Sequence, residues 1–420
     1  MRAARLFGIV GVASLCGMSC AQSPPPGLVQ PAAAVAAAPA ASARQIPRSQ
    51  ASLPTTDAAI TVGNFLSLYA VMPPGQRVSM LATHAQFFGA LDDYDAALRA
   101  ADELVKTRPA VAEAWLARAG ARQSLHEFQG ALADLAQAEK LGADRDAVAA
   151  GRAGVWQALG RYDEALAVRR RLVKVRATTA TLAAYAVLRG EMGDVADAEA
   201  KFLDAQDAFE DVSPFTLAWL YFQNGLVEER AGRPAAAREL YEAAHARLPE
   251  YAPATGHLAT AVALAGDEQR AMALLEPLVA ASDDPEYQAQ LGVLLRRNGQ
   301  AARGDELIAR AGRRYEALVR RHPDAFADHA ARFWLGAGGD AGRALALARR
   351  NLAARQTRDA YDLAMRAALA AHDAAAACRF ADEAERVPYA SAALHLSMSE
   401  AFAACRRGAR AALELQAAAR

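Results

Sequence analysis

The chain has 420 residues, of which 53% are hydrophobic and 22% charged, and its 47 lysines and arginines balance 47 aspartates and glutamates. This apolar content excludes a disordered chain. Zero net charge argues against nucleic acid as the main ligand, since proteins that bind it carry a basic stripe. The length exceeds what one globular core normally holds, but an array in which each unit touches only its neighbours escapes that limit.

Residues 1–21 have the pattern of a signal peptide. Arg2 and Arg5 supply its positive start, an apolar run follows over 6–15, and Ala21 ends a small-residue cleavage site. Cys20 permits a second interpretation, because the residues before it resemble a degenerate lipobox in which the cysteine is lipidated after cleavage. Both interpretations stay open, and both predict export to the periplasm, attachment to the outer membrane or secretion.

Residues 22–58 are rich in proline and alanine and begin with the run Pro24, Pro25 and Pro26. Proline cannot continue a helix, and this stretch offers no core, so it is expected to be a disordered linker. Residues 59–77 then predict an N-terminal helix or cap.

A repeat of about 34 residues begins near residue 78. Six turn glycines are spaced by 33, 39, 34, 33 and 40 residues: Gly160, Gly193, Gly232, Gly266, Gly299 and Gly339. A small residue follows each glycine by five positions, and another lies twelve positions before that in every unit but the eighth, where Arg332 suggests a helix register shifted by one residue. Small residues let two helices approach closely, and glycine allows the tight turn between them. No segment shows the alternation of a strand.

This pattern resembles the tetratricopeptide repeat (TPR), a pair of antiparallel helices. The best local matches are 159–165 and 237–244, the latter followed by Pro249, and the resemblance covers roughly 78–420. It implies an all-α superhelical solenoid of about ten TPR-like helix pairs. The gaps of 39 and 40 predict lengthened helices near 211–221 and 309–322, and the last unit has Arg406 in place of glycine.

In proteins of this family the first helix of each pair lines a concave groove that binds the ligand. Carried onto this chain, the resemblance implies a partner-binding surface of aromatic and charged side chains in the fifth, seventh and eighth units: Trp219, Phe222, Glu229, Arg230, Arg296, Arg297, Phe326 and Phe333. Aromatic residues and arginine are enriched at binding hot spots. The competing interpretation is that Trp219 and Phe222 only pack the longer helix of their unit.

Two further features carry weaker signals. Cys378 and Cys405 fall in neighbouring helices, and export favours a disulfide between them. Counted from the turn near Pro388, however, they are offset by a turn or more at ~1.5 Å per residue, so the bridge is left open. The eight histidines form no metal-ligand spacing, and the Gly336–Ala341 match to a dinucleotide fingerprint falls in a helix–helix turn. No metal and no cofactor are expected.

We therefore expect a non-enzymatic scaffold of the cell envelope, exported and docking a protein or peptide in its groove, with contact to a membrane only through a lipid anchor at Cys20. A passive spacer is the alternative, because units two to four look bland. A glycan-binding component of an exopolysaccharide exporter is a third class. The fold of a repeat scaffold does not by itself identify its function.

Overall fold

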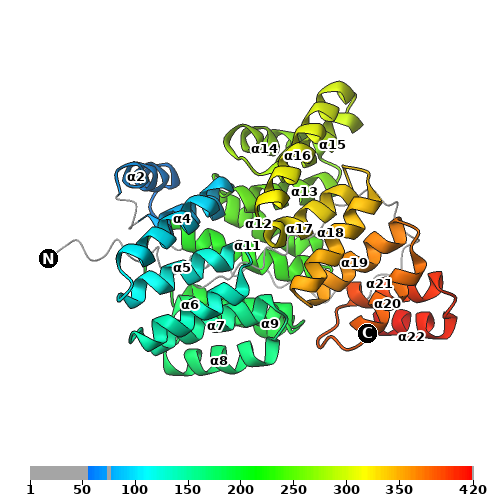
Figure 1. The fold of residues 1–420 in the computed structure, drawn as a ribbon. Coiled ribbons are helices and arrows are strands. Elements are labelled where there is room, and N and C mark those ends of the chain that lie inside the picture. The colour runs from blue at the N-terminus through cyan, green and yellow to red at the C-terminus, as the bar shows by residue number, and fades with distance from the viewer. Residues whose placement is uncertain (1–54, 73–76, 419–420) are drawn as a thin grey trace.

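The computed structural model describes residues 55–72 and 77–418, and over these ranges it contains 21 helices and no strand (Figure 1). One helix, α2 (Ala58–Val71), precedes ten consecutive helix pairs, as the repeat predicts. The pairs, numbered here as units 1 to 10, are α3 (Val78–Phe88) with α4 (Asp92–Thr107), α5 (Ala112–Ser124) with α6 (Phe128–Lys140), α7 (Arg145–Ala158) with α8 (Tyr162–Val175), α9 (Thr179–Glu191) with α10 (Val195–Asp207), α11 (Pro214–Arg230) with α12 (Pro234–Arg247), α13 (Ala252–Leu264) with α14 (Glu268–Ala281), α15 (Pro285–Arg297) with α16 (Ala301–Arg321), α17 (Pro323–Leu335) with α18 (Ala341–Ala354), α19 (Arg358–Ala370) with α20 (Ala374–Ala384), and α21 (Ala392–Ala404) with α22 (Gly408–Ala418).

The turn inside each pair uses a residue in the left-handed backbone region. All six glycines of the predicted series have positive φ, from 65° at Gly339 to 95° at Gly266. Three units without glycine bend at the same place with other residues, His126 and His372 at φ 58° and Arg406 at 63°. The geometry of the turn is therefore kept where the sequence signal is lost.

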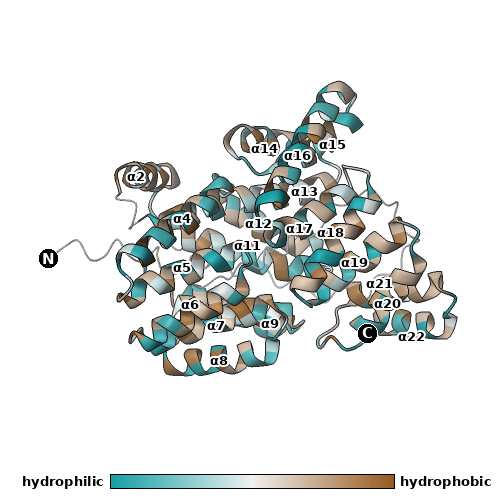
Figure 2. Ribbon diagram, viewed as in Figure 1, coloured by the Kyte–Doolittle hydropathy of each residue, from teal (hydrophilic) through white to brown (hydrophobic). Residues whose placement is uncertain are grey.

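Small residues fill the closest helix contacts. Ala97, Ala131, Ala165 and Ala198 are fully buried. Phe202 and other large side chains occupy the wider gaps between units in one extended core. Apolar and polar residues share individual helices, as the mixture of brown and teal on single helices shows (Figure 2). This is the pattern of helices that bury one face against a neighbour.

The two enlarged spacings correspond to long helices. α11 has 17 residues and α16 has 21, against 11 to 16 in the other helices of the pairs. In unit 8, Ala330 and Ala331 are both fully buried directly before the half-buried Arg332, so the small side chains of this helix precede the position that Arg332 occupies.

The superhelix returns alongside itself after five to six units. Turns inside units 1 to 4 contact loops that join later units, through residue pairs separated by 168 to 226 positions in the chain. α3 also packs against α13, and Phe87 lies 4.6 Å from Tyr251 between ring centroids. The first unit therefore covers the concave side of units 5 and 6.

Helix α2 joins the same two regions. Phe65 stacks near Phe88 and lies 5.7 Å from Phe215 of α11, and the amide of Thr56 donates to the carbonyl of Val212 at 2.8 Å. Over the ranges that the structure covers, no helix is both long enough and apolar enough to cross a bilayer. The expected signal peptide, Cys20 and almost all of the linker lie outside the described residues.

Cys378 of α20 and Cys405 at the end of α21 form a disulfide with their Cα atoms 6.2 Å apart. The offset expected from helix rise is absent because α20 ends at Ala384 and a seven-residue connection precedes α21. This longer connection lets the two helices slide relative to one another.

Candidate functional site

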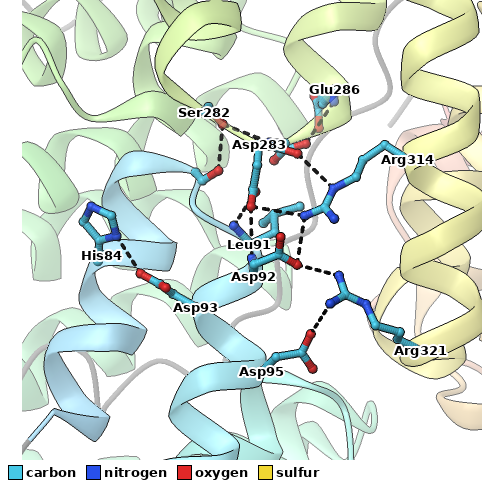
Figure 3. Close-up of polar contacts among 12 residues, drawn as sticks. His84, Leu91, Asp92, Asp93, Asp95, Ser282, Asp283, Glu286, Arg314 and Arg321 are labelled. Atoms are coloured by element: carbon cyan, nitrogen blue, oxygen red, sulfur yellow. Dashed lines mark hydrogen bonds and ion pairs between the residues drawn. The ribbon is translucent and has the colours of Figure 1, made fainter. Parts of the chain in front are cut away.

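Polar contacts also join the two superhelical turns, and the first of them lie at unit 1 (Figure 3). Asp283, in the loop before α15, accepts hydrogen bonds from the backbone amides of Leu91 at 2.6 Å and Asp92 at 3.2 Å. These amides start α4, so a carboxylate about 190 residues away caps that helix. Burial raises the pKa of Asp283, while these amide hydrogen bonds oppose the rise.

Two arginines of α16 extend this junction. Arg314 pairs with Asp283 at 3.1 Å and with Asp92 at 3.2 Å, and Arg321 pairs with Asp92 and Asp95 at 2.6 Å each (Figure 3). Burial raises the pKa of Asp92, but the two guanidinium groups outweigh it and lower the pKa overall. The junction is a network rather than one exposed pair, which makes it more stabilising than isolated surface ion pairs.

Replacing Asp283 with alanine is expected to lower the free energy of unfolding by about 1–2 kcal/mol, because it removes the cap of α4 and one arginine partner. Amide hydrogen exchange should accelerate at Gly89–Asp92. Asp144→Ala is the matched control, since Asp144 caps its own helix α7 at 2.8 Å. Equal exchange rates at Gly89–Asp92 in wild type and Asp283→Ala would contradict the cross-turn cap.

Three further contacts join the two superhelical turns. His126 Nδ1 lies 2.9 Å from the carbonyl of Asp324, and the hydroxyl of Tyr389 donates to Asp163 at 2.6 Å. Gly160 comes so close to the chain at Gln356 that an added Cβ would lie 2.8 Å from the carbonyl oxygen. Glycine at this position therefore serves both the turn and the approach of the second superhelical turn.

A buried ion network lies between the turns. Asp328 of α17 pairs with Arg355, and both side chains are almost fully buried. Burial raises the pKa of Asp328, but His329 and Arg355 outweigh it and hold the pKa well below its usual range. Burial likewise opposes the ionisation of Asp359, whose pKa is nevertheless lowered by Arg230 and Arg358. The charges here are mutually compensated, as structural pairs require.

Beside the junction of Figure 3 lies the inter-turn pocket, which is partly open to solvent and formed by helices of units 1, 2, 6, 7 and 8. Its aromatic lining is Tyr94, Tyr287, Tyr315 and Phe326. Its polar lining is Gln86, Ser124, His126, Asp284 and His329. A concave site with aromatic walls and a few polar groups is the usual form of a ligand pocket.

The polar groups at this pocket have displaced pKa values. Burial raises the pKa of Asp284, and burial followed by the charge of Asp284 raises the pKa of nearby Glu286 to about 8. Burial, and then Arg355, lowers the pKa of His126 to about 4, so its ring is neutral at pH 7. The pocket therefore has the buried carboxyl of Asp284 in its lining and Glu286, neutral at pH 7, beside it, and displaced pKa values of this kind are enriched at functional sites.

The four predicted aromatic binding residues are buried rather than exposed in an open groove. Trp219 and Phe222 are 3% and 5% exposed and belong to the central core, where Phe222 contacts Tyr251 and His257 of unit 6. Phe333 packs on Tyr315 with 5.0 Å between ring centroids. Phe326, 8% exposed, is the one of the four that lines the inter-turn pocket.

The four predicted charged residues separate into two groups. Glu229 accepts a hydrogen bond from Tyr241 and lies 3.1 Å from His257, and Arg230 interacts electrostatically with Glu191 and Asp359. Arg296 and Arg297 are exposed on α15 and pair with Asp305 and Glu268. The structure therefore does not gather the eight residues into one surface, and their binding role stays a prediction.

Sequence reasoning missed Asp283, Asp284, Tyr94 and Tyr315. The run Ser282–Asp283–Asp284–Pro285 does carry the signal of a helix start, and Asp284 caps α15 by accepting from the amide of Glu286 at 2.9 Å. What it could not reveal is that this loop meets unit 1. No group of three or more metal-ligating side chains occurs among the residues that the structure describes.

Comparison with known proteins supports the repeat assignment. A tetratricopeptide repeat family model matches residues 230–293, which span the end of α11 through most of α15. A search of curated protein sequences finds no match.

Several solved structures are similar in fold at low identity. Human IFIT1, determined as a dimer with PPP-AAAA, is 14% identical, with 88% of this chain and 95% of that chain covered and a TM-score of 0.42. A tetratricopeptide repeat protein from Parabacteroides merdae is 16% identical over 58% and 93% of the two chains, with a TM-score of 0.37. Pseudomonas aeruginosa PilF is 15% identical over 53% and 94%, with a TM-score of 0.39. The family model places tetratricopeptide repeats at residues 230–293, and the ten helix pairs give the described part of the chain the architecture of a TPR-like α-solenoid.

Proposed function

We propose that this protein is a non-enzymatic interaction scaffold of the cell envelope that docks one protein or peptide partner at the inter-turn pocket. The observation that carries the proposal is the pocket itself, a concavity partly open to solvent whose aromatic walls come from two superhelical turns. Repeat solenoids present a rigid surface of this kind. Envelope location rests on the leader pattern in residues 1–21.

The pocket favours docking over a passive spacer. A spacer needs only continuous packing between units, and compensated pairs such as Asp328–Arg355 provide that. The pocket instead combines Phe326, tyrosines and a carboxyl of raised pKa, a combination that packing alone does not require. Aromatic side chains around a concavity are typical of interaction hot spots.

Ser124→Phe is expected to abolish capture of the partner from an envelope extract of the source cells. Ser124 lines the pocket, and its hydroxyl bonds only to the carbonyl of Gly120 in its own helix, at 3.3 Å, so the ring would fill the pocket at little cost to the fold. Quantitative mass spectrometry of the proteins captured by wild type and variant is the measurement.

Ala235→Phe is the matched control, because it adds the same ring on an exposed position of α12 and should leave capture unchanged. Circular dichroism melting of both variants checks that they fold. Capture that is equal in wild type and Ser124→Phe would refute docking at this pocket.

A further inference from the structure

We propose that the inter-turn pocket receives a guanidinium group, presented by an arginine side chain of the docking partner. The inference rests on the proposed function and deepens it by naming the group that is recognised. Three observations carry it: the aromatic walls, the presence of Asp284 in the lining, and the absence of a lysine or arginine among the residues that line the pocket.

The walls suit a flat cation. Tyr94, Tyr287, Tyr315 and Phe326 come from α4, α15, α16 and α17, so rings approach the space from both superhelical turns. Ring faces attract cations, and the planar guanidinium stacks on them better than a lysine ammonium does. These rings are held by the helices on which they lie, so little ordering is needed when a ligand enters.

The polar lining offers acceptors. Asp284 lines the pocket, and the cap of α15 uses one of its two carboxylate oxygens. Gln86 and Ser124 add neutral oxygens. Guanidinium carries five donors in a rigid fork and is recognised by such carboxylates.

The electrostatic balance also favours a cation. Asp284 is the one acidic residue of the lining, and no lysine or arginine lines the pocket with it. Of the groups behind the lining, Asp328 is paired with Arg355 and Asp283 with Arg314, while Glu286, whose pKa is about 8, and His126 are neutral at pH 7. Burial raises the pKa of Asp284, so an entering cation would stabilise the ionised carboxylate.

The test is calorimetric titration of the purified chain with the blocked peptide Gly-Gly-Arg-Gly-Gly and with its citrulline analogue, which has the same shape and no charge. The arginine peptide should bind at least about tenfold more tightly, because citrulline cannot make the charged hydrogen bonds of a guanidinium to a carboxylate.

Asp284→Asn should reduce the affinity for the arginine peptide about tenfold while leaving the fold intact, because asparagine caps helices as well as aspartate does. Asp267→Asn is the matched control, since Asp267 caps α14 in the same way at 3.0 Å on an exposed position. It should bind like wild type.

Equal affinity for the arginine and citrulline peptides, or for wild type and Asp284→Asn, would overturn the inference. Methylguanidinium that binds as tightly as the peptide would also overturn it, because the ligand would then be a free small cation. Partner capture that is lost in Ser124→Phe but unchanged in Asp284→Asn would leave the proposed function standing and the arginine inference refuted. Capture that persists in Ser124→Phe would refute the proposed function itself.

Discussion

Arg355→Met is expected to lower the free energy of unfolding by about 3–5 kcal/mol, because it leaves the carboxylate of Asp328, 2% exposed, without its buried cation. His329 remains nearby but lies 3.8 Å from the carboxylate. The effect should be large because the pair is buried where α17 and α18 meet the other superhelical turn. Urea denaturation followed by circular dichroism measures it.

Arg350→Met is the matched control five positions earlier. Arg350 pairs with Asp324 at 2.8 Å, yet both side chains are about half exposed, so the loss should stay within about 0.5 kcal/mol. The double variant Arg355→Met with Asp328→Leu should recover most of the stability, since neither charge then remains buried. A double variant no more stable than Arg355→Met alone would show that the cost is lost packing rather than an unpaired charge.

Local structure was predictable because it repeats. Glycines such as Gly160 and Gly339 mark the helix–helix turns. The spacing of 33 to 40 residues between consecutive turn glycines predicts both the helix pairs and the two long helices. Arg406 shows the limit of that signal, since it adopts the same positive φ without being glycine. Glycine makes this turn favourable in most units. In the others, the stacking of neighbouring units allows a residue other than glycine to adopt the same backbone conformation.

The closure of the superhelix was not predictable from the repeat. Asp283 meets Leu91 only because small rotations between six units add up to one turn, and a slight change in each would separate them. Trp219 and Phe222 are buried in the central core, where Phe222 packs on Tyr241 of its own unit and on Tyr251 and His257 of unit 6. Alanine at either position would therefore test stability rather than docking.

The pocket arises from the same closure. Tyr94 belongs to unit 1 and Tyr315 to unit 7, and nothing in either repeat marks these tyrosines as partners. Phe326 was identified because the resemblance places groove residues on the first helix of each pair. A site built from two superhelical turns is visible only when the whole solenoid is assembled.

Glu286→Gln is expected to make the protein more stable than wild type at pH 9 and to change little at pH 5. Burial, and then Asp284, raises the pKa of Glu286 to about 8 from a usual value of 4.5. The folded state therefore holds a proton that the unfolded state loses between these values, so the wild type loses stability as pH rises through this window. Glutamine keeps the acceptor for Gln290, which donates at 3.0 Å, and has no charge to bury.

Between pH 7 and pH 9 the stability advantage of Glu286→Gln over wild type should grow by roughly 1 kcal/mol, because the wild type stops losing stability above the folded-state pKa of about 8, and urea denaturation measures this difference. This range avoids His126, whose pKa of about 4 in the folded state makes the protein lose stability as pH falls below about 6.5. Glu139→Gln is the control, because the hydrogen bond and charge of exposed Arg152 lower the pKa of Glu139, so its replacement should give no gain at high pH. If Glu286→Gln and wild type lost stability in parallel from pH 7 to pH 9, the carboxyl of Glu286 would be ionised at neutral pH. In that case the inter-turn pocket would carry more negative charge than Asp284 alone supplies.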